Sequence, residues 1–413
     1  MRAEAVNTLM IPMHPRRRAA TRRALPVLVG LVLLWGSPAA ADSVDPWVYA
    51  YAGLDHFYNM EYDEAIANIE KAIEGEPANP IFYNFLANAY LFRELHRLGQ
   101  LDANLYGASN AFLQAKMRKP DPAQVAKVKE IVARVKELCE ERLRENPRDV
   151  DALYSLGVAY GIEGNYKFTI EKSWYQALRA GTKANNLHKK VLKLDPNFHD
   201  AKLIPGLYQY VVGSIPGSVK WLAFFFGFRG SKTRGIELLQ DALAHGKLVA
   251  SDAAVLLSVI YNREKRYDYA RQLLRPLAEF YPRNPLLSLE IGRTYIREGQ
   301  RKKALGHYVT VAQGMEAGKP GYDKLPRERL WYQIGVLYQQ EHQFAKALAA
   351  YSQITDRSDS DGLLKAYSGL RRGEIFLAQR HRERARTEYQ RVAAMPYEEP
   401  RREAERHLRA LRK

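Results

Sequence analysis

Cysteine is almost absent from this sequence of 413 residues, which contains Cys139 and no other. A single thiol cannot close an intramolecular disulfide and cannot supply a CxxC metal site. No cysteine stands just after the apolar stretch near the N-terminus, which excludes lipid attachment at a new N-terminal cysteine. From Val125 to Cys139 apolar residues recur at three and four positions, which predicts a helix with a buried, unreactive thiol.

The sequence also lacks the residue patterns of common enzyme classes. It has no HExxH, GxSxG or HxE…CxxC arrangement, and the paired carboxylates Glu398–Glu399 stand among basic residues, which indicates a solvated face. Residues 230–233 lack the glycine that precedes lysine in a phosphate-binding loop, so we expect Ser231 or Thr233 to cap the next helix instead. We therefore predict a protein without catalytic residues or a cofactor.

A metal ion is not expected either. Residues 356–362 resemble the first half of a calcium-binding loop. The position twelve residues into that frame holds Ser368 rather than glutamate, and the frame begins on Arg357. We expect a solvated turn between repeats at this place.

The formal net charge of +17 is concentrated at the two ends of the chain. The first 41 residues hold six arginines against one glutamate, and residues 371–413 hold thirteen arginines and lysines against seven glutamates. Between these ends no basic stripe alternates with aromatic residues. Because clustered positive charge is the expected sign of nucleic-acid binding, we predict no nucleic-acid partner.

The N-terminal residues have the pattern of an export signal. Arg16–Arg18 form a positive region, Leu25–Trp35 form a short apolar region, and Ala39–Ala41 fit a cleavage site. We expect cleavage of residues 1–41 between Ala41 and Asp42, and a periplasmic or secreted protein. The apolar run is shorter than the roughly 20 residues that span a bilayer, but an uncleaved anchor is the alternative, and the export route stays open.

The strongest positive feature is self-similarity at a spacing of 34 residues. Ser258, Tyr261 and Ala270 recur as Gly292, Tyr295 and Ala304, and the pattern returns after nine inserted residues with a leading tryptophan. Weaker copies occur elsewhere. The repeat-packing positions identified in this way are Gly53, Ala65, Gly157, Tyr160, Tyr261, Ala270, Gly292, Tyr295, Ala304, Gly335, Tyr338 and Ala347.

This pattern is that of the tetratricopeptide repeat (TPR), a pair of antiparallel helices with a 34-residue period. Small residues let the two helices approach closely, and a proline after the second helix ends it. One pair cannot bury its apolar stripe alone, so neighbouring pairs must stack. We predict an all-α, TPR-like α-solenoid of about seven to eight helix pairs, some degenerate. The expected parts are residues 42–250 with insertions, an array over 251–398, and a basic tail or helix over 399–413.

Residues 214–235, SIPGSVKWLAFFFGFRGSKTRG, interrupt the repeats with five aromatic rings in eight positions. Trp221, Phe224 and Phe228 fall on one face of a helix. The apolar run over 219–228 would be about 15 Å long as a helix, which is half the hydrocarbon thickness of a bilayer, so it does not span. We favour burial inside the solenoid. A partner surface and contact with a membrane interface are the alternatives.

Residues 206–243 carry a narrower resemblance. This segment is similar to one in the tetratricopeptide repeat protein 39 and inclusion-body clearance family, and the resemblance implies a non-enzymatic adaptor. The residues that carry it are Ile215, Pro216, Gly227, Phe228, Gly230, Gly235 and Leu239. The chain departs from the family in its export signal, so cytosolic or organelle roles do not transfer.

The concave surface of such a solenoid is the candidate functional site. At about 100° per residue, positions 2, 5, 9 and 12 of each first helix fall opposite the packing positions. The residues predicted to line this groove are Asn84, Asn88, Tyr154, Asn262, Arg293, Tyr332 and Gln339. Such side chains can hold a peptide backbone or carboxylate, although ordinary solvated polar residues would show the same pattern.

The function predicted from the sequence is an exported, non-enzymatic TPR scaffold that binds a protein or peptide partner. The alternative is a peripheral membrane-associated or cell-envelope polysaccharide-binding protein. That alternative would use Phe224–Phe226 and the basic C-terminus.

Overall fold

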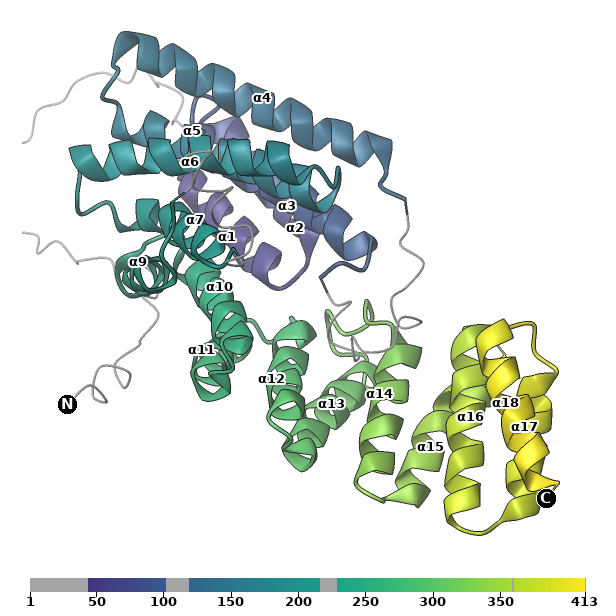
Figure 1. The fold of residues 1–413 in the computed structure, drawn as a ribbon. Coiled ribbons are helices and arrows are strands. Elements are labelled where there is room, and N and C mark those ends of the chain that lie inside the picture. The colour runs from purple at the N-terminus through teal and green to yellow at the C-terminus, as the bar shows by residue number, and fades with distance from the viewer. Residues whose placement is uncertain (1–43, 102–118, 216–228, 359, 413) are drawn as a thin grey trace, which may run out of the picture. The chain divides into compact units, whose positions relative to one another are not determined.

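The computed structural model describes residues 44–101, 119–215, 229–358 and 360–412 (Figure 1). The predicted export signal over 1–41 and the aromatic residues Phe224–Phe226 lie outside these ranges.

The first helices are α1 (Pro46–Tyr58), α2 (Tyr62–Gly75), α3 (Pro80–Arg97), α4 (Pro122–Glu145), α5 (Val150–Thr169), α6 (Trp174–Leu194), the short 3-10 helix η2 (His199–Lys202), α7 (Leu203–Gly213) and α9 (Lys232–His245). The later ones are α10 (Ala250–Arg263), α11 (Tyr267–Phe280), α12 (Pro285–Arg297), α13 (Arg301–Glu316), α14 (Arg327–Gln340), α15 (Phe344–Thr355), α16 (Gly362–Ala378), α17 (Arg382–Ala393) and α18 (Glu398–Leu411).

The fold is all-α throughout the described ranges, and sequential helices pack as antiparallel pairs in a TPR-like solenoid, which confirms the predicted fold class. Contacts divide the chain into two compact units. Of the described residues, the first unit takes those up to Leu54, Ala65–Ala87 and those within Lys129–Ala253, and the second takes Asp55–Glu64 and those within Asn88–Val128 and Ala254–Lys413. The predicted parts over 42–250, 251–398 and 399–413 remain a prediction.

Short polar residues begin several of these helices and fix where each starts. The side chain of each N-cap residue accepts a backbone N–H from the first turn, which otherwise has no partner. Residues that cap in this way are Asp149, Ser231, Asn284 and Asp361. Ser231 accepts from the N–H of Arg234, which confirms one of the two predicted caps. Asp361 shows that the acidic segment over 356–362 serves to start α16.

A glycine–tyrosine contact repeats through the second unit and explains the motif. Tyr308, Tyr351 and Tyr389 are each fully buried on the second helix of a pair. A Cβ added to Gly335 would lie 2.5 Å from the ring of Tyr351, and one added to Gly373 would lie 2.5 Å from the ring of Tyr389. Because only glycine leaves room for the ring, it sets how closely the two helices of a pair approach.

Two of the insertions in the first half of the chain lengthen helices where the structure describes them. Some fifteen residues are inserted between Tyr160 and Pro196 relative to the repeat, and both helices of this pair are long: α5 has 20 residues and α6 has 21. Helix α4, with 24 residues, extends beyond the predicted span over 125–139 at both ends. Its Cys139 is fully buried, and burial raises the pKa of the thiol to about 12. The thiol is therefore protonated at neutral pH and unreactive, as expected.

One contact in the second unit joins residues far apart in the sequence. The turn over residues 55–64, which we call the Asn59 turn, packs against Arg283 between α11 and α12. The backbone N–H of Arg283 donates to the side-chain oxygen of Asn59 at 3.1 Å, across 224 positions of sequence. The guanidinium of Arg283 also donates to Glu61 and to Asp55, both at 2.8 Å. Residues near the N-terminus therefore complete a unit built mainly from the C-terminal half.

Among the residues that the structure describes, no helix combines the length and the apolar content needed to cross a lipid bilayer.

Candidate binding surface

Several first helices of the second unit meet on one side, which we call the inner face. Helix α14 contacts α16, and α16 contacts α18. Polar side chains link these helices in series. Asn262 on α10 donates to Glu290 on α12 at 3.0 Å, and Gln339 on α14 donates to Glu374 on α16 at 3.1 Å. The inner face therefore presents a row of polar groups that are already oriented by hydrogen bonds.

Four of the seven predicted groove residues are buried and cannot themselves contact a partner. These are Asn84, Tyr154, Asn262 and Tyr332. In the first unit, Asn84 donates to the backbone oxygen of Ser155 at 2.9 Å and so joins α3 to α5. The ring of Tyr154 lies 4.9 Å from that of Phe198, which follows α6 and covers it. The expectation of a solvent-facing groove at these positions is corrected, because neighbouring elements pack over them.

The three remaining residues are partly exposed. Asn88 is half-buried in α3, whereas Arg293 on α12 and Gln339 on α14 lie on the inner face. The guanidinium of Arg293 donates to both carboxylate oxygens of Glu290, through Nε at 2.6 Å. The side-chain oxygen of Asn262 is buried and has no hydrogen-bond partner among the described residues. Asn262, Glu290 and Arg293 thus form a hydrogen-bonded polar cluster, which we call the Arg293 cluster.

Sequence reasoning missed two apolar residues beside this cluster. Val255 and Val259 lie one turn apart on α10, with exposed fractions of 38% and 53%. They occupy positions 5 and 9 of the first helix, which are inner-face positions in the repeat. The groove residues predicted at those positions are polar or aromatic, and the two valines are not among them. The sequence does contain a sign of this pair: Val255 and Val259 are apolar, yet the packing of the repeat does not use positions 5 and 9.

A second polar cluster lies further along the inner face, on α14 and α16. Arg371 donates to both oxygens of Glu374, at 3.1 and 2.9 Å, and to the hydroxyl of Tyr332 at 3.4 Å. The hydroxyl of Tyr351 donates to Gln339 at 2.9 Å. Burial opposes the positive charge of Arg371, but Tyr332 and Glu374 outweigh it and raise the pKa of the guanidinium. The guanidinium of Arg371 therefore stays positively charged.

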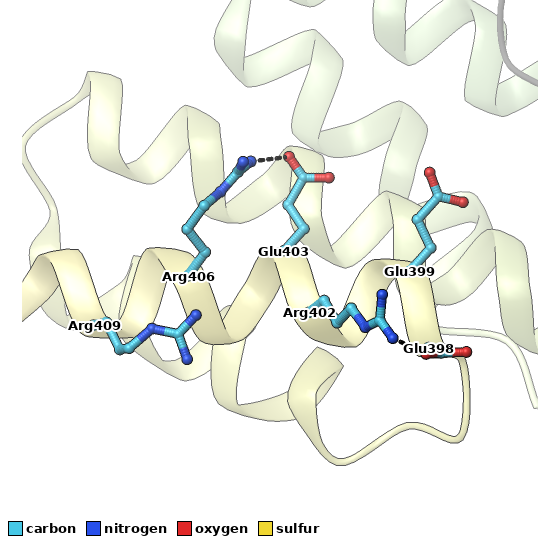
Figure 2. Close-up of a pocket in the computed structure, with 6 residues that line it drawn as sticks. All are labelled: Glu398, Glu399, Arg402, Glu403, Arg406 and Arg409. Carbon is cyan, nitrogen blue, oxygen red and sulfur yellow. Dashed lines mark hydrogen bonds and ion pairs between the residues drawn. The ribbon is translucent and has the colours of Figure 1, made fainter.

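The C-terminal helix α18 borders a hollow of about 500 Å³ whose lining mixes both signs of charge (Figure 2). Its lining residues are Glu398, Glu399, Arg402, Glu403, Arg406 and Arg409. Figure 2 shows Arg406 and Glu403 pointing toward one another, 2.9 Å apart, and Arg402 pairs with Glu398. The basic C-terminus named in the alternative function is thus partly neutralised by its own glutamates.

Comparisons with known proteins find only distant likenesses, all to solved structures. No family model matches the chain, and no curated protein matches it. Similar solved structures include a Cut9–Hcn1 complex (13% identity, TM-score 0.44, 91% of this chain and 57% of that one). Another is yeast Tom70, with 14% identity and a TM-score of 0.34 over 89% of this chain and 89% of that one. A third is a tetratricopeptide repeat protein of Parabacteroides merdae, with 15% identity and a TM-score of 0.29 over 89% of this chain and 99% of that one. The chain spans little more than half of the first of these.

Proposed function

We propose that the protein is a non-enzymatic scaffold whose inner face in the second unit binds a protein or peptide partner. The observation that carries the proposal is the exposed pair Val255 and Val259 next to the Arg293 cluster. An exposed apolar pair loses water favourably when it is covered. Arginine with a fixed orientation is enriched among the residues that contribute most to protein interfaces. The valine pair would supply affinity through apolar contact, and Arg293 would orient the partner through directional hydrogen bonds on the same surface.

The second polar cluster extends this surface along the same series of helices. Its Arg371–Glu374 pair and the amide of Gln339 are held by hydrogen bonds before any partner arrives. Side chains that are already oriented lose little entropy on binding. The resemblance of residues 206–243 to an adaptor family is consistent with this role, and we include membership of that family in the proposal.

Crosslinking tests the surface directly. A photoreactive amino acid placed at Val259 should give a discrete adduct with one protein in the native cell. The same probe at Val48 on α1, which has a similar exposed fraction of 56%, should give none. The partner, once identified by mass spectrometry and purified, should bind the Val259→Asp variant at least about tenfold more weakly, since a charge replaces apolar contact.

Two outcomes decide this test. Equal crosslinking at Val48 and Val259, or unchanged affinity of the purified partner for both Val259→Asp and Arg293→Ala, would contradict the proposal. Val48→Asp is the matched control for affinity, and circular dichroism of all variants checks that the helices persist.

We propose further that this scaffold works outside the cytoplasm. The arginine-rich, apolar and small-residue regions of residues 1–41 support export. Mass spectrometry of the protein from its own cells should find a mature chain that begins at Asp42. A Leu31→Arg, Leu33→Arg double variant should stay uncleaved in the cytoplasm, because charge disrupts the apolar region, whereas Arg16→Lys should be processed normally. A full-length wild-type chain in the cytoplasm would contradict export.

A further inference from the structure

Three potential metal ligands converge where α16 meets α18. Glu374 lies on α16, whereas Glu403 and His407 lie four residues apart on α18 and so share one of its faces. The nearest ligand atoms of these three side chains all lie within 4.8 Å of one another. Ligands placed tetrahedrally about 2.1 Å from a zinc ion stand about 3.4 Å apart. Small changes of side-chain rotamer therefore suffice to close the three around one ion.

A buried hydroxyl without a partner lies beside these ligands. Tyr389 on α17 is 0% exposed, and its hydroxyl has no hydrogen-bond partner among the described residues. The equivalent tyrosine of the preceding repeat, Tyr351, donates to Gln339. Four residues after the motif glycine, α16 has Leu377 in place of that glutamine. An unsatisfied buried hydroxyl is costly, so a water molecule or an ion with its water beside Tyr389 would stabilise the folded state.

Geometry places that hydroxyl at the ligand cluster. The ring of Tyr389 lies parallel to that of His407, at 4.6 Å between centroids and an angle of 7°. Its outer carbon atoms contact Gly373, the residue before Glu374.

The surrounding charges allow a divalent cation to bind. Arg371 and Gln339 both donate to Glu374 and hold it in place, as the outer partners of metal-binding carboxylates commonly do. Glu403 forms an ion pair with Arg406, whose side chain is 69% exposed. An exposed pair of this kind is weak, so Arg406 can leave Glu403 at little cost.

We propose that Glu374, Glu403 and His407 form a Zn²⁺ site at the C-terminal end of the inner face. One imidazole and two carboxylates suit zinc, with a water molecule as the fourth ligand. The hydroxyl of Tyr389 then hydrogen-bonds to that water and is no longer unsatisfied. The ion joins α16 to α18. Glu374 also belongs to the second polar cluster of the proposed binding surface. Zinc binding is nevertheless tested without a partner, so its failure and the failure of partner binding can be told apart.

A second cluster of potential ligands in the first unit is unsuitable for a cation. His199, Asp241 and His245 also bring ligand atoms within 4.8 Å. The ammonium of Lys202 already lies 2.7 Å from Asp241 and 3.1 Å from His199. Lys202 thus contacts two of the three ligand residues, one of them through a ring nitrogen, whereas the arginines at the proposed site pair with the carboxylates. The cluster still has to be disabled in a test, since two histidines can capture zinc weakly.

Calorimetric titration of the full chain with Zn²⁺ alone, in the His245→Ala background, tests the proposal. We expect one site per chain and a rise in the thermal unfolding midpoint, because binding to the folded state stabilises it. Adding His407→Ala should weaken binding at least about tenfold. Glu403→Gln, which keeps the shape of the side chain, should do the same. His381→Ala, a histidine exposed at the start of α17, is the matched control and should bind zinc normally.

Three results would overturn the proposal: no zinc binding in the His245→Ala background, binding undiminished by both His407→Ala and Glu403→Gln, or an equal loss in His381→Ala. Circular dichroism shows whether each variant is folded. If His407→Ala unfolds, Glu403→Gln decides alone, since it removes one charge and no volume.

Discussion

Replacing Gly235 with alanine should lower the free energy of unfolding by about 3 kcal/mol, because overpacking at a tight contact costs about that much. Gly235 lies where α9 packs against α7. A Cβ added there would lie 2.6 Å from the backbone nitrogen of Tyr210 and 2.7 Å from the backbone oxygen of Gly206. Backbone atoms inside a helix cannot rotate away as a side chain can. The two helices would therefore have to separate and lose contact along their length.

Urea denaturation followed by circular dichroism measures this effect as a shift of the unfolding midpoint. Gly181→Ala is the matched control. It makes the same change in α6, in the same unit, with no atom within 4 Å of the new Cβ. Since alanine favours helix, this variant should be unchanged or more stable by up to about 1 kcal/mol. Equal midpoints for Gly235→Ala and Gly181→Ala would refute the close backbone contact.

Glu388→Ala should destabilise the second unit by about 3 kcal/mol, because it leaves a buried charge without its partner. The Glu388 carboxylate is almost fully buried on α17. It accepts from Arg372 through Nε at 3.1 Å and lies 3.0 Å from a second guanidinium nitrogen. The Arg372 side chain is only 16% exposed. Asp356, 3.5 Å from Arg372 and largely exposed, compensates only in part.

The double variant Arg372→Met, Glu388→Leu separates this cause from simple loss of packing. Replacing both members of a buried ion pair with apolar residues is often neutral or stabilising. We therefore expect the double variant to unfold at a higher urea concentration than Glu388→Ala. A double variant as unstable as the single one would mean that packing, and not the uncompensated charge, accounts for the loss.

The sequence predicted the fold well because the repeat encodes local packing. The spacing of 16 residues from Gly335 to Tyr351 and from Gly373 to Tyr389 specifies which ring lies over which glycine. That glycine–tyrosine contact and the helix caps are both specified by residues close together in the sequence, so a helix pair can be predicted from local spacing. The long helices α5 and α6 were harder to predict, since inserted residues that continue a helix carry no turn signal.

The candidate surface was predicted less well, for a different physical reason. Helical periodicity gives the direction of a side chain but not what covers it. Tyr154 points where a groove residue should, yet the ring of Phe198 packs over it. The ligands Glu374 and His407 come from helices that are not adjacent in the sequence, and no local pattern brings them together. The sequence therefore predicted no metal ion, and only their relative placement suggests one.

The Asn59 turn has a consequence for how the chain acquires its structure. Most tetratricopeptide contacts form between neighbours, so a growing polypeptide can fold pair by pair as it leaves the ribosome. The hydrogen bond from Arg283 to Asn59 cannot form until 224 further positions have been synthesised. Distant contacts of this kind slow folding. Until Arg283 has been synthesised, Asn59, Glu61 and Asp55 lack the hydrogen bonds that it donates, so this part of the second unit is completed last.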